Sequence, residues 1–284
     1  MSIVYNWHIT EHCNYSCHYC FAQWDRPPEA WKDDEQVISI LENLKNNGHL
    51  AFDNKLKSPI RLNFAGGEPL LLRGKLLSTI KLANQLGLIT SVITNGSLLA
   101  EQVNIAKHTD MIGISIDSFN IETNHQIGRC TRSGSTLSYS DLTSLIAKIR
   151  GMNNSIKIKF NVVVNKHNFQ EQIIEKLQLL TPYKIKILKE LSAGKNVSSM
   201  NGAMFEHFIS VNKYNAPNVF IEDNNAMTES YLMIDPQGRL YQNGQDSGYC
   251  YSKPIQEIGI KEALNSIKFN STAFMERYKG TQHG

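Results

Sequence analysis

The chain has 284 residues, of which 41% are hydrophobic and 19% charged, and its formal net charge is +3 at pH 7. This length can bury a sizeable core, as one α/β barrel or as two domains, and we expect one main domain. The charge is too small to indicate a nucleic-acid or membrane partner, and no apolar run is long enough to span a bilayer. Five cysteines, an odd number, argue against a disulfide framework.

Strand-like and helix-like patterns alternate along the first 190 residues. Alternating apolar and polar residues predict a strand at 3–10, and an acidic start with apolar residues at helical spacing predicts a helix at 33–47. Five more strands are predicted at 59–64, 89–94, 111–117, 156–164 and 183–188, with helices at 71–86, 97–107, 141–152 and 170–179. This alternation predicts a parallel sheet, in an open doubly wound fold or in an incomplete α/β barrel.

Beyond residue 190 the pattern changes. The sequence predicts a polar loop at 190–201, a helix at 203–211, short strands at 219–221, 231–234 and 239–242, a helix at 260–267 and a tail at 274–284. We do not expect these segments to continue the alternation of strand and helix. We expect residues 191–284 to form a C-terminal extension that belongs to the same folding unit and covers the mouth of a barrel.

Three cysteines, Cys13, Cys17 and Cys20, lie within eight residues directly after the first predicted strand. On a loop, three thiolates can converge on one small, soft metal centre. A structural zinc normally takes four ligands, whereas an iron–sulfur cluster held by three cysteines leaves one iron open for another ligand. The cluster is our leading interpretation, and a zinc site completed by His12 or His18, or plain buried thiols, are the alternatives.

Polar residues occupy every second position of most predicted strands. Strand by strand they are Asn6, His8 and Thr10; Arg61 and Asn63; Ser115 and Asp117; Lys157, Lys159 and Asn161; and Lys184 and Lys186. Residues of one parity share a face, so an apolar face is expected under the helices and a polar face toward a lumen. Five cations against one acid, Asp117, predict that a polyanion such as a nucleoside triphosphate fills this lumen, because buried charge is costly unless paired. The alternative is that some of the lysines lie at exposed strand ends.

The ends of three predicted strands carry further candidate residues. Gly66 and Gly67 allow a ligand to approach the backbone closely, and Glu68 could accept a hydrogen bond from an ammonium group. Asn95 could bind a ribose, or could simply belong to a turn. Arg129 could bind a carboxylate or phosphate, or could lie on the surface.

The pattern Cys13-x-x-x-Cys17-x-x-Cys20, with aromatic residues at Tyr19 and Phe21, precedes a strand that ends in Asn63-Phe64-Ala65-Gly66-Gly67-Glu68-Pro69. Together they resemble the radical S-adenosylmethionine (SAM) superfamily. The resemblance implies a partial (β/α)6 TIM-like barrel over residues 1–190, with the cluster-binding loop at 11–25. It also implies a [4Fe-4S] cluster, held by the three cysteines, whose open iron binds the amino and carboxylate groups of SAM.

Nearly the whole chain resembles the viperin family and its prokaryotic viperin-like nucleotide dehydratases. The matching stretches include Asn6-x-His8-x-Thr10, Asn95-Gly96-Ser97-Leu98, Ile127-Gly128-Arg129, Lys159-Phe160-Asn161, Lys184-x-Lys186 and Ser230-Tyr231-Leu232. By this resemblance, the residues that bind SAM would be Tyr19, Gly66, Gly67, Glu68, Asn95, Ser115 and Arg129. The residues that bind the nucleotide would be Asn6, His8, Arg61, Lys159, Asn161, Lys184, Lys186 and Tyr231.

The resemblance implies an antiviral dehydratase that converts CTP, UTP or GTP into its 3'-deoxy-3',4'-didehydro analogue, a chain terminator. A 5'-deoxyadenosyl radical from SAM would take the hydrogen from C4', and the 3' hydroxyl would leave as water. One more electron and a proton would complete the product, and Tyr231 would supply the last proton or hydrogen atom, unless it only packs against a hairpin. An electron donor such as a flavodoxin or ferredoxin is also implied.

Two departures from animal viperins limit the resemblance. The membrane-binding amphipathic helix is missing, and the residues after Tyr241 and at Arg277-Tyr278-Lys279-Gly280 match only loosely. We therefore expect a cytoplasmic monomer with no membrane or nucleic-acid partner, and the preferred base stays open. The alternatives are a radical SAM enzyme that matures peptides or cofactors, although only Cys130 and Cys250 remain for an auxiliary cluster, and a non-catalytic zinc-binding module.

Overall fold

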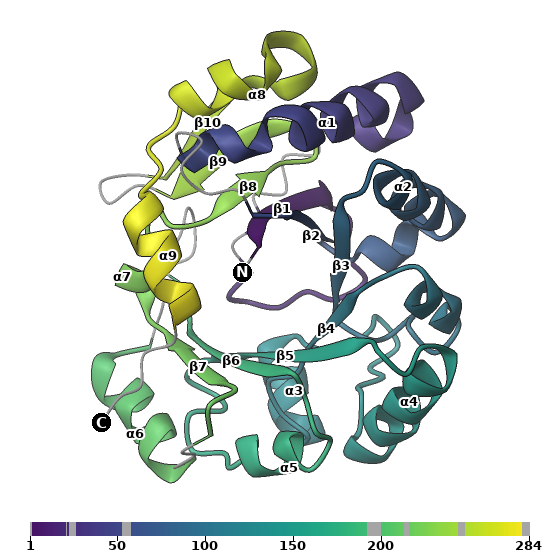
Figure 1. The fold of residues 1–284 in the computed structure, drawn as a ribbon. Helices are drawn as coiled ribbons and strands as arrows, with labels where there is room; N and C mark the ends of the chain where they lie inside the picture. The colour runs from purple at the N-terminus through teal and green to yellow at the C-terminus, as the bar shows by residue number, and fades with distance from the viewer. Residues whose placement is uncertain are drawn as a thin grey trace.

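The computed structural model describes residues 2–20, 22, 27–52, 58–191, 200–212, 216–243 and 248–279, and for residues 278 and 279 it describes the backbone alone. Ten strands of these ranges form one sheet in the order β10-β9-β8-β1-β2-β3-β4-β5-β6-β7. The sheet curves around a central space and carries most helices on its outer side (Figure 1). The strands are β1 (Ile3–Thr10), β2 (Ile60–Gly66), β3 (Ile89–Thr94), β4 (Met111–Ser115), β5 (Lys157–Val164), β6 (Lys184–Lys189), β7 (Val219–Glu222), β8 (Leu232–Ile234), β9 (Arg239–Asn243) and β10 (Tyr249–Pro254).

Three helices begin or end at residues suited to helix termini. Asp33 caps the first helix by accepting from two backbone N–H groups, Ser138 and Asp141 form a capping box at the fourth, and Gly128 ends the third in a left-handed conformation. The α-helices are α1 (Asp34–Asn47), α2 (Gly74–Gln85), α3 (Ile121–Ile127), α4 (Tyr139–Met152), α5 (Ile174–Gln178), α6 (Gly202–Val211), α7 (Asn224–Met227), α8 (Ile255–Asn265) and α9 (Ser271–Lys279). Short 3-10 helices are η1 (Ala30–Lys32), η2 (Gly48–Phe52), η3 (Pro69–Leu72) and η4 (Val103–Lys107). No helix in the described ranges is both long enough and apolar enough to cross a membrane.

The predicted partial barrel with a two-faced sheet is confirmed. Tyr5, Trp7 and Phe64 are completely buried on the side that faces the helices. On the other side, parallel pairing places Asn6 beside Asn63, and Asn161 beside Lys186. Because paired residues in a parallel sheet point to the same face, polar side chains from distant strands meet inside the curved sheet.

The expectation that the repeat ends after the sixth strand was wrong. Helix α6 and strand β7 continue the alternation of helix and strand, because β7 pairs in parallel with β6 and places Ile221 beside Ile187. Strand β7 has four residues, and the pattern of apolar and polar residues over so short a segment cannot distinguish a parallel edge strand from a strand of a hairpin. Beyond β7, β8 pairs in parallel with the other end of the repeat, at β1, and continues into antiparallel β9 and β10.

Smaller differences concern two predicted helices and one lysine. The segment 97–107 contains turns and the 3-10 helix η4 instead of an α-helix, and the predicted helix 170–179 shortens to α5. Lys157 lies at the exposed start of β5, with its ammonium 4.9 Å from the ring centroid of Tyr183, and it does not line the cavity inside the sheet. Most of the predicted loop 190–201, Phe21 and the tail beyond residue 279 lie outside the described residues.

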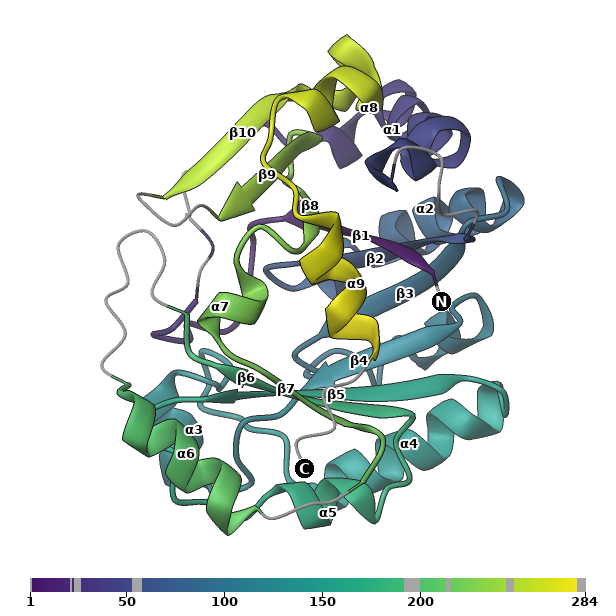
Figure 2. The same cartoon turned by 60° about the vertical axis from the view of Figure 1, so that its left-hand side comes forward.

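The sheet does not close on itself, because β10 and β7 are its two edges. Helix α9 lies between β8 and β7 in both views (Figures 1 and 2). Arg277 on this helix contacts both sides of the opening: it donates to the carbonyl oxygen of Ser230, just before β8, and pairs with Glu222 in β7 at 3.7 Å. The C-terminal helix thus bridges the open side of the barrel.

Candidate functional site

A cavity of about 660 Å³ extends from the cysteine loop to the polar face of the sheet. Its wall includes the three cysteines of the loop and, from the strands opposite, Lys159, Asn161 and Lys186. A concave site of this size is typical of small-molecule and cofactor sites. The residues that the sequence assigns to a metal centre and those that it assigns to a polyanion therefore share one cavity.

The glycine pair after β2 holds the start of the cysteine loop. Gly67 donates its N–H to the carbonyl oxygen of Thr10 at 2.7 Å, and Glu68 donates to that of His12 at 2.7 Å. A Cβ atom on Gly67 would lie 2.1 Å from the carbonyl oxygen of His12, and Gly66 has a φ of +135°. Only glycine fits this close approach of two backbones, so the pair positions the loop as well as lining the cavity.

Three further hydrogen bonds hold the rest of the loop. Ser16 and His18 donate their backbone N–H groups to the carbonyl oxygens of Gly128 and Ile127, at 3.1 and 3.0 Å. Asn95 donates its Nδ2 to Oδ1 of Asn14 at 2.8 Å, and lies 4.0 Å from Cys13 Sγ. The loop is thus anchored to the ends of three other elements before any ligand is bound.

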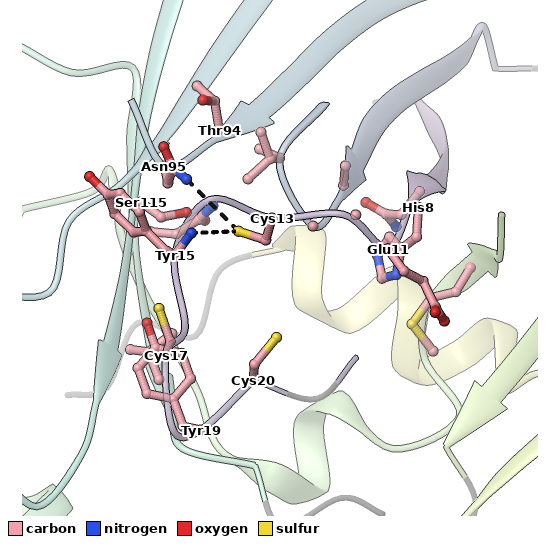
Figure 3. Close-up of a pocket in the computed structure, with 18 of the residues that line it drawn as sticks. His8, Glu11, Cys13, Tyr15, Cys17, Tyr19, Cys20, Thr94, Asn95 and Ser115 are labelled. Carbon is pink, nitrogen blue, oxygen red and sulfur yellow. Dashed lines mark hydrogen bonds between the residues drawn. The ribbon is translucent and has the colours of Figure 1, made fainter. Parts of the chain in front are cut away.

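The three sulfur atoms lie around one open space (Figure 3). Burial raises the pKa of Cys13 to about 11 and that of Cys20 to about 12, which favours the neutral thiols unless a positive centre lies nearby. No group of three or more His, Cys, Asp or Glu side chains in the described ranges is arranged to hold a metal ion. His18, one candidate for a fourth zinc ligand, turns its ring nitrogens toward Ile127 and Glu190.

Arg129 joins the cysteine loop to the end of β4. It is 8% exposed, pairs with Asp117 at 3.5 Å and donates to the hydroxyl of Tyr19 at 3.0 Å. It also donates to the carbonyl oxygen of Ser115 and lies 3.8 Å from the sulfur of Cys17. Three of the residues predicted to bind SAM, Tyr19, Ser115 and Arg129, are therefore brought together beside one cysteine.

Glu68, another residue predicted to bind SAM, is not on the cavity wall. Its carboxylate is completely buried and accepts hydrogen bonds from the hydroxyl of Thr94 and from the backbone N–H groups of Leu70 and Asn95, at 2.8, 3.0 and 2.7 Å. These hydrogen bonds hold the end of β3 against the end of β2, and the one from the backbone N–H of Asn95 positions that residue. The direct contact between Glu68 and an ammonium group stays a prediction.

Lys159 places a buried cation in the lumen, and Asn161 places a buried amide oxygen there that accepts no hydrogen bond from the described residues. Burial, and then the nearby cations Lys186 and Arg61, hold the pKa of Lys159 well below its usual value. Asn161 Oδ1 and Arg61 Nε are buried without a hydrogen-bond partner among the described residues. Such groups are rare in proteins and indicate a missing ligand or water.

The other predicted nucleotide residues lie at different depths. Asn6 and His8 are on the cavity wall, where Asn6 accepts from Asn63 at 2.9 Å and His8 contacts the hydroxyl of Tyr241. Arg61 and Lys184 are not on that wall, and the Lys184 ammonium lies 3.7 Å from the ring centroid of Phe220. The structure therefore brings six of the eight together around the cavity, including Tyr231.

Two residues of the site were missed by the sequence analysis. Glu222 in β7 accepts a hydrogen bond from Tyr231 and pairs with Lys186, and Arg277 in α9 lies over the ring of Tyr231. Glu222 belongs to a strand that the sequence analysis did not assign to the barrel, and Arg277 belongs to a tail that matched only loosely. The expected single acid of the lumen, Asp117, is instead engaged by Arg129 and Tyr19.

Residues 7–180 match the Radical SAM superfamily. An S-adenosylmethionine-dependent nucleotide dehydratase of Fibrobacter sp. (strain UWH6) is 40% identical over 302 residues, covering 98% of this chain and 88% of the relative. The protein of the same name from Pseudoalteromonas ulvae is 38% identical over 288 residues, covering 98% and 93%. Both relatives match over nearly their full length.

Solved structures share the fold at lower identity. Native anSMEcpe with bound AdoMet and Kp18Cys peptide superposes with a TM-score of 0.67 at 16% identity, covering 96% of this chain and 83% of that one. Streptococcus suis SuiB bound to S-adenosylmethionine superposes with a TM-score of 0.62 at 16% identity, covering 97% and 67%. By its sequence match and its relatives, the chain belongs to the radical SAM superfamily and, within it, to the family of SAM-dependent nucleotide dehydratases.

Proposed function

We propose that the protein is a radical SAM dehydratase that converts a ribonucleoside triphosphate, namely CTP, UTP or GTP, into its 3'-deoxy-3',4'-didehydro analogue. The observation that carries this proposal is the shared cavity, which has the three cysteines on one wall and Lys159, Asn161 and Lys186 on another. A radical reaction at the sugar requires its source and its target to be held next to each other. The protein relatives named nucleotide dehydratases support the same activity.

The cysteine loop fits an iron–sulfur cluster. Three thiols border one open space, and a cluster accepts each thiolate at a different iron, so they need not converge on one ion. Cys13, Cys17 and Cys20 would hold a [4Fe-4S] cluster, and SAM would occupy its open iron. When bound, the cluster and SAM supply the 5'-deoxyadenosyl radical that takes the hydrogen atom from C4'.

The neighbouring residues would hold SAM. Tyr19, Asn95, Ser115 and Arg129 line the cavity beside the loop, together with both glycines after β2. Arg129 offers a planar guanidinium that suits a carboxylate. Glu68 would act chiefly by holding Asn95 in place.

The lysines of β5 and β6 would bind the triphosphate. Lys159 is buried close to other cations, and an anionic phosphate would relieve both the repulsion and the lowered pKa. Asn161, with its unsatisfied Oδ1, would accept a hydrogen bond from a sugar hydroxyl. Arg61 and Lys184, behind the wall, would add positive potential, and Asn6 and His8 would border the nucleotide.

Tyr231 would supply the last proton or hydrogen atom. It lies on the cavity wall, and its hydroxyl is hydrogen-bonded to Glu222. The product has no 3' hydroxyl, so it would end a growing RNA chain, which supports a role in antiviral defence. The protein would act as a cytoplasmic monomer supplied with electrons by a flavodoxin or ferredoxin.

The test is an anaerobic assay with reconstituted, reduced protein and SAM. CTP, UTP, GTP and ATP are added separately, and mass spectrometry follows 5'-deoxyadenosine and a product lighter than its nucleotide by one water. We expect at least one of the first three nucleotides to stimulate both. The proposal is wrong if no nucleotide stimulates SAM cleavage, or if the anaerobic protein contains zinc and no iron.

A further inference from the structure

Glu222 lies at the centre of the contacts around Tyr231. Its side chain is 3% exposed, and its Oε2 accepts the hydrogen bond of the Tyr231 hydroxyl. Its Oε1 pairs with the ammonium of Lys186, which also donates to the Tyr231 oxygen at 3.1 Å. The three side chains form a closed triangle in which the Tyr231 hydrogen is directed at a carboxylate.

Two cations keep this carboxylate ionised. Burial alone would raise the pKa of Glu222, but Lys186 and Arg277 hold it at about 2. The guanidinium of Arg277 lies 3.6 Å from the ring centroid of Tyr231 and 3.7 Å from Glu222 Oε2. At neutral pH, Glu222 is therefore an acceptor for the phenol hydrogen and not a donor.

This geometry decides how a tyrosine can deliver an electron. A phenol that loses an electron becomes a far stronger acid than any carboxylic acid, so oxidation is much easier when a base already accepts its hydrogen bond. Glu222 is such a base. Among the described residues, it is the carboxylate to which the Tyr231 hydroxyl donates its hydrogen bond. Burial of Tyr231 raises its pKa, which makes simple ionisation before oxidation unfavourable.

Building on the proposed dehydratase, we propose that Tyr231 gives up its hydrogen atom in two parts in the last step, the electron to the nucleotide and the proton to Glu222, which acts as the proton acceptor. Before this step, the 3' hydroxyl has taken up one proton from solvent and left as water, which breaks the C3'–O bond and turns the C4' radical into a radical cation. Tyr231 passes one electron to it, which completes the C3'–C4' double bond, while the phenol proton moves to Glu222. The Tyr231 radical then takes one electron from a low-potential iron–sulfur or flavin protein and the proton back from Glu222, so that this step consumes one external electron, in addition to the one that cleaves SAM.

The decisive variant is Glu222→Gln, which keeps the size and the hydrogen-bond acceptor but cannot take a proton. We expect it to behave as Tyr231→Phe does: the dehydrated nucleotide falls about 100-fold, as for loss of a general base, while 5'-deoxyadenosine changes much less. The double variant should be no worse than either single variant, because both remove the same step. Glu222→Asp, which keeps a carboxylate, should recover part of the product.

Three controls separate this role from a structural one. Glu171→Gln also removes a carboxylate that accepts a hydrogen bond from a hydroxyl, since Glu171 accepts from Ser118 at 2.6 and 2.8 Å. This variant should leave the ratio of dehydrated nucleotide to 5'-deoxyadenosine unchanged. Nucleotide binding to the cluster-free protein should not weaken in Glu222→Gln, because Lys186 and Arg277 keep their charges. Freeze-quenched wild-type enzyme should show a tyrosyl radical by paramagnetic resonance that Tyr231→Phe lacks.

The inference is overturned if Glu222→Gln forms product at the wild-type rate, or if no tyrosyl radical is seen in a turning-over wild type. The search for a tyrosyl radical in the wild type tests the inference even if Glu222→Gln does not fold. It is also overturned if the losses of the two single variants multiply in the double variant. If the wild type itself forms no dehydrated nucleotide, the proposed function fails instead, so the two failures are distinguishable.

Discussion

The two walls of the cavity are built in different ways. On the cysteine wall, the loop is held by backbone contacts with Gly67, Gly128 and Ile127, and the thiols face the open space. On the opposite wall, Lys186 is already paired with Glu222, whereas Lys159 lies close to the cations Lys186 and Arg61. The first wall is ready to receive a group that brings its own charge, whereas the second neutralises part of its own charge before a substrate arrives.

The difference follows from the cost of buried charge. A thiol can stay protonated and neutral, so the cysteines need no counterion when the ligand is absent. An arginine cannot be deprotonated, and a buried lysine either finds a counterion or loses its proton. Glu222 serves as the counterion for Lys186 and Arg277, whereas Lys159 responds to burial with a lowered pKa. An arriving triphosphate therefore competes with Glu222 for the first pair and raises the pKa of the other lysine.

The largest expected effect is on the cysteine wall. Cys17→Ala should abolish iron binding and the formation of 5'-deoxyadenosine, because two cysteines of the loop remain and the cluster needs three. Nucleotide binding to the cluster-free protein should stay unchanged, since the cations lie on the opposite wall. Iron analysis and calorimetric titration measure the two properties.

Cys250→Ala is the matched control, because Cys250 is exposed and lies outside the loop. It should retain iron and activity. If Cys17→Ala kept a full complement of iron, or if it lost nucleotide binding as well, the independence of the two walls would be disproved.

The next effect is on the opposite wall. Lys186→Ala should weaken nucleotide binding about 10- to 100-fold, because a hydrogen bond to a charged group contributes about 1.5–3 kcal/mol. The visible absorbance of the cluster should not change. Lys184→Ala should have a smaller effect, since Lys184 lies behind the cavity wall.

Lys157→Ala provides the comparison for these lysine variants, because it removes an exposed lysine at the start of β5. It should bind nucleotide as tightly as the wild type. Unchanged affinity in both Lys184→Ala and Lys186→Ala would remove these residues from the phosphate site.

The smallest effect is a pH dependence of nucleotide binding. Burial, followed by repulsion from Lys186, lowers the pKa of Lys184 to about 8. Its cationic form attracts a polyanion and exists below this pH, so affinity should fall several-fold as the pH rises from about 7 to about 9. Titration calorimetry at each pH measures it.

Lys184→Arg keeps a charge at every pH in this range and should remove this part of the pH dependence. If the affinity of the wild type for the nucleotide is the same at both pH values, the charge of Lys184 does not contribute to nucleotide binding.

Much of the site could be predicted because its signals are local. The spacing of three cysteines needs only eight residues, and the polar parity of β1, β2, β5 and β6 is visible within each strand. The glycine pair could be recognised, but its contact with the backbone of His12 could not, because that depends on the path of a different segment. The same holds for Glu68, whose carboxylate accepts hydrogen bonds from Thr94, Leu70 and Asn95.

The sequence by itself determined the cysteine loop, the alternation of strands and helices and the polar face of the barrel, because each is a short-range pattern of residue types. Only the tertiary structure decided that β7 joins β6 and that α9 crosses the open side. Those two placements bring Glu222, Tyr231 and Arg277 to Lys186. These contacts depend on strand pairing and helix packing between segments that are far apart in the sequence, and no local pattern relates one segment to the other. The proton acceptor of Tyr231 could therefore be identified only from the fold.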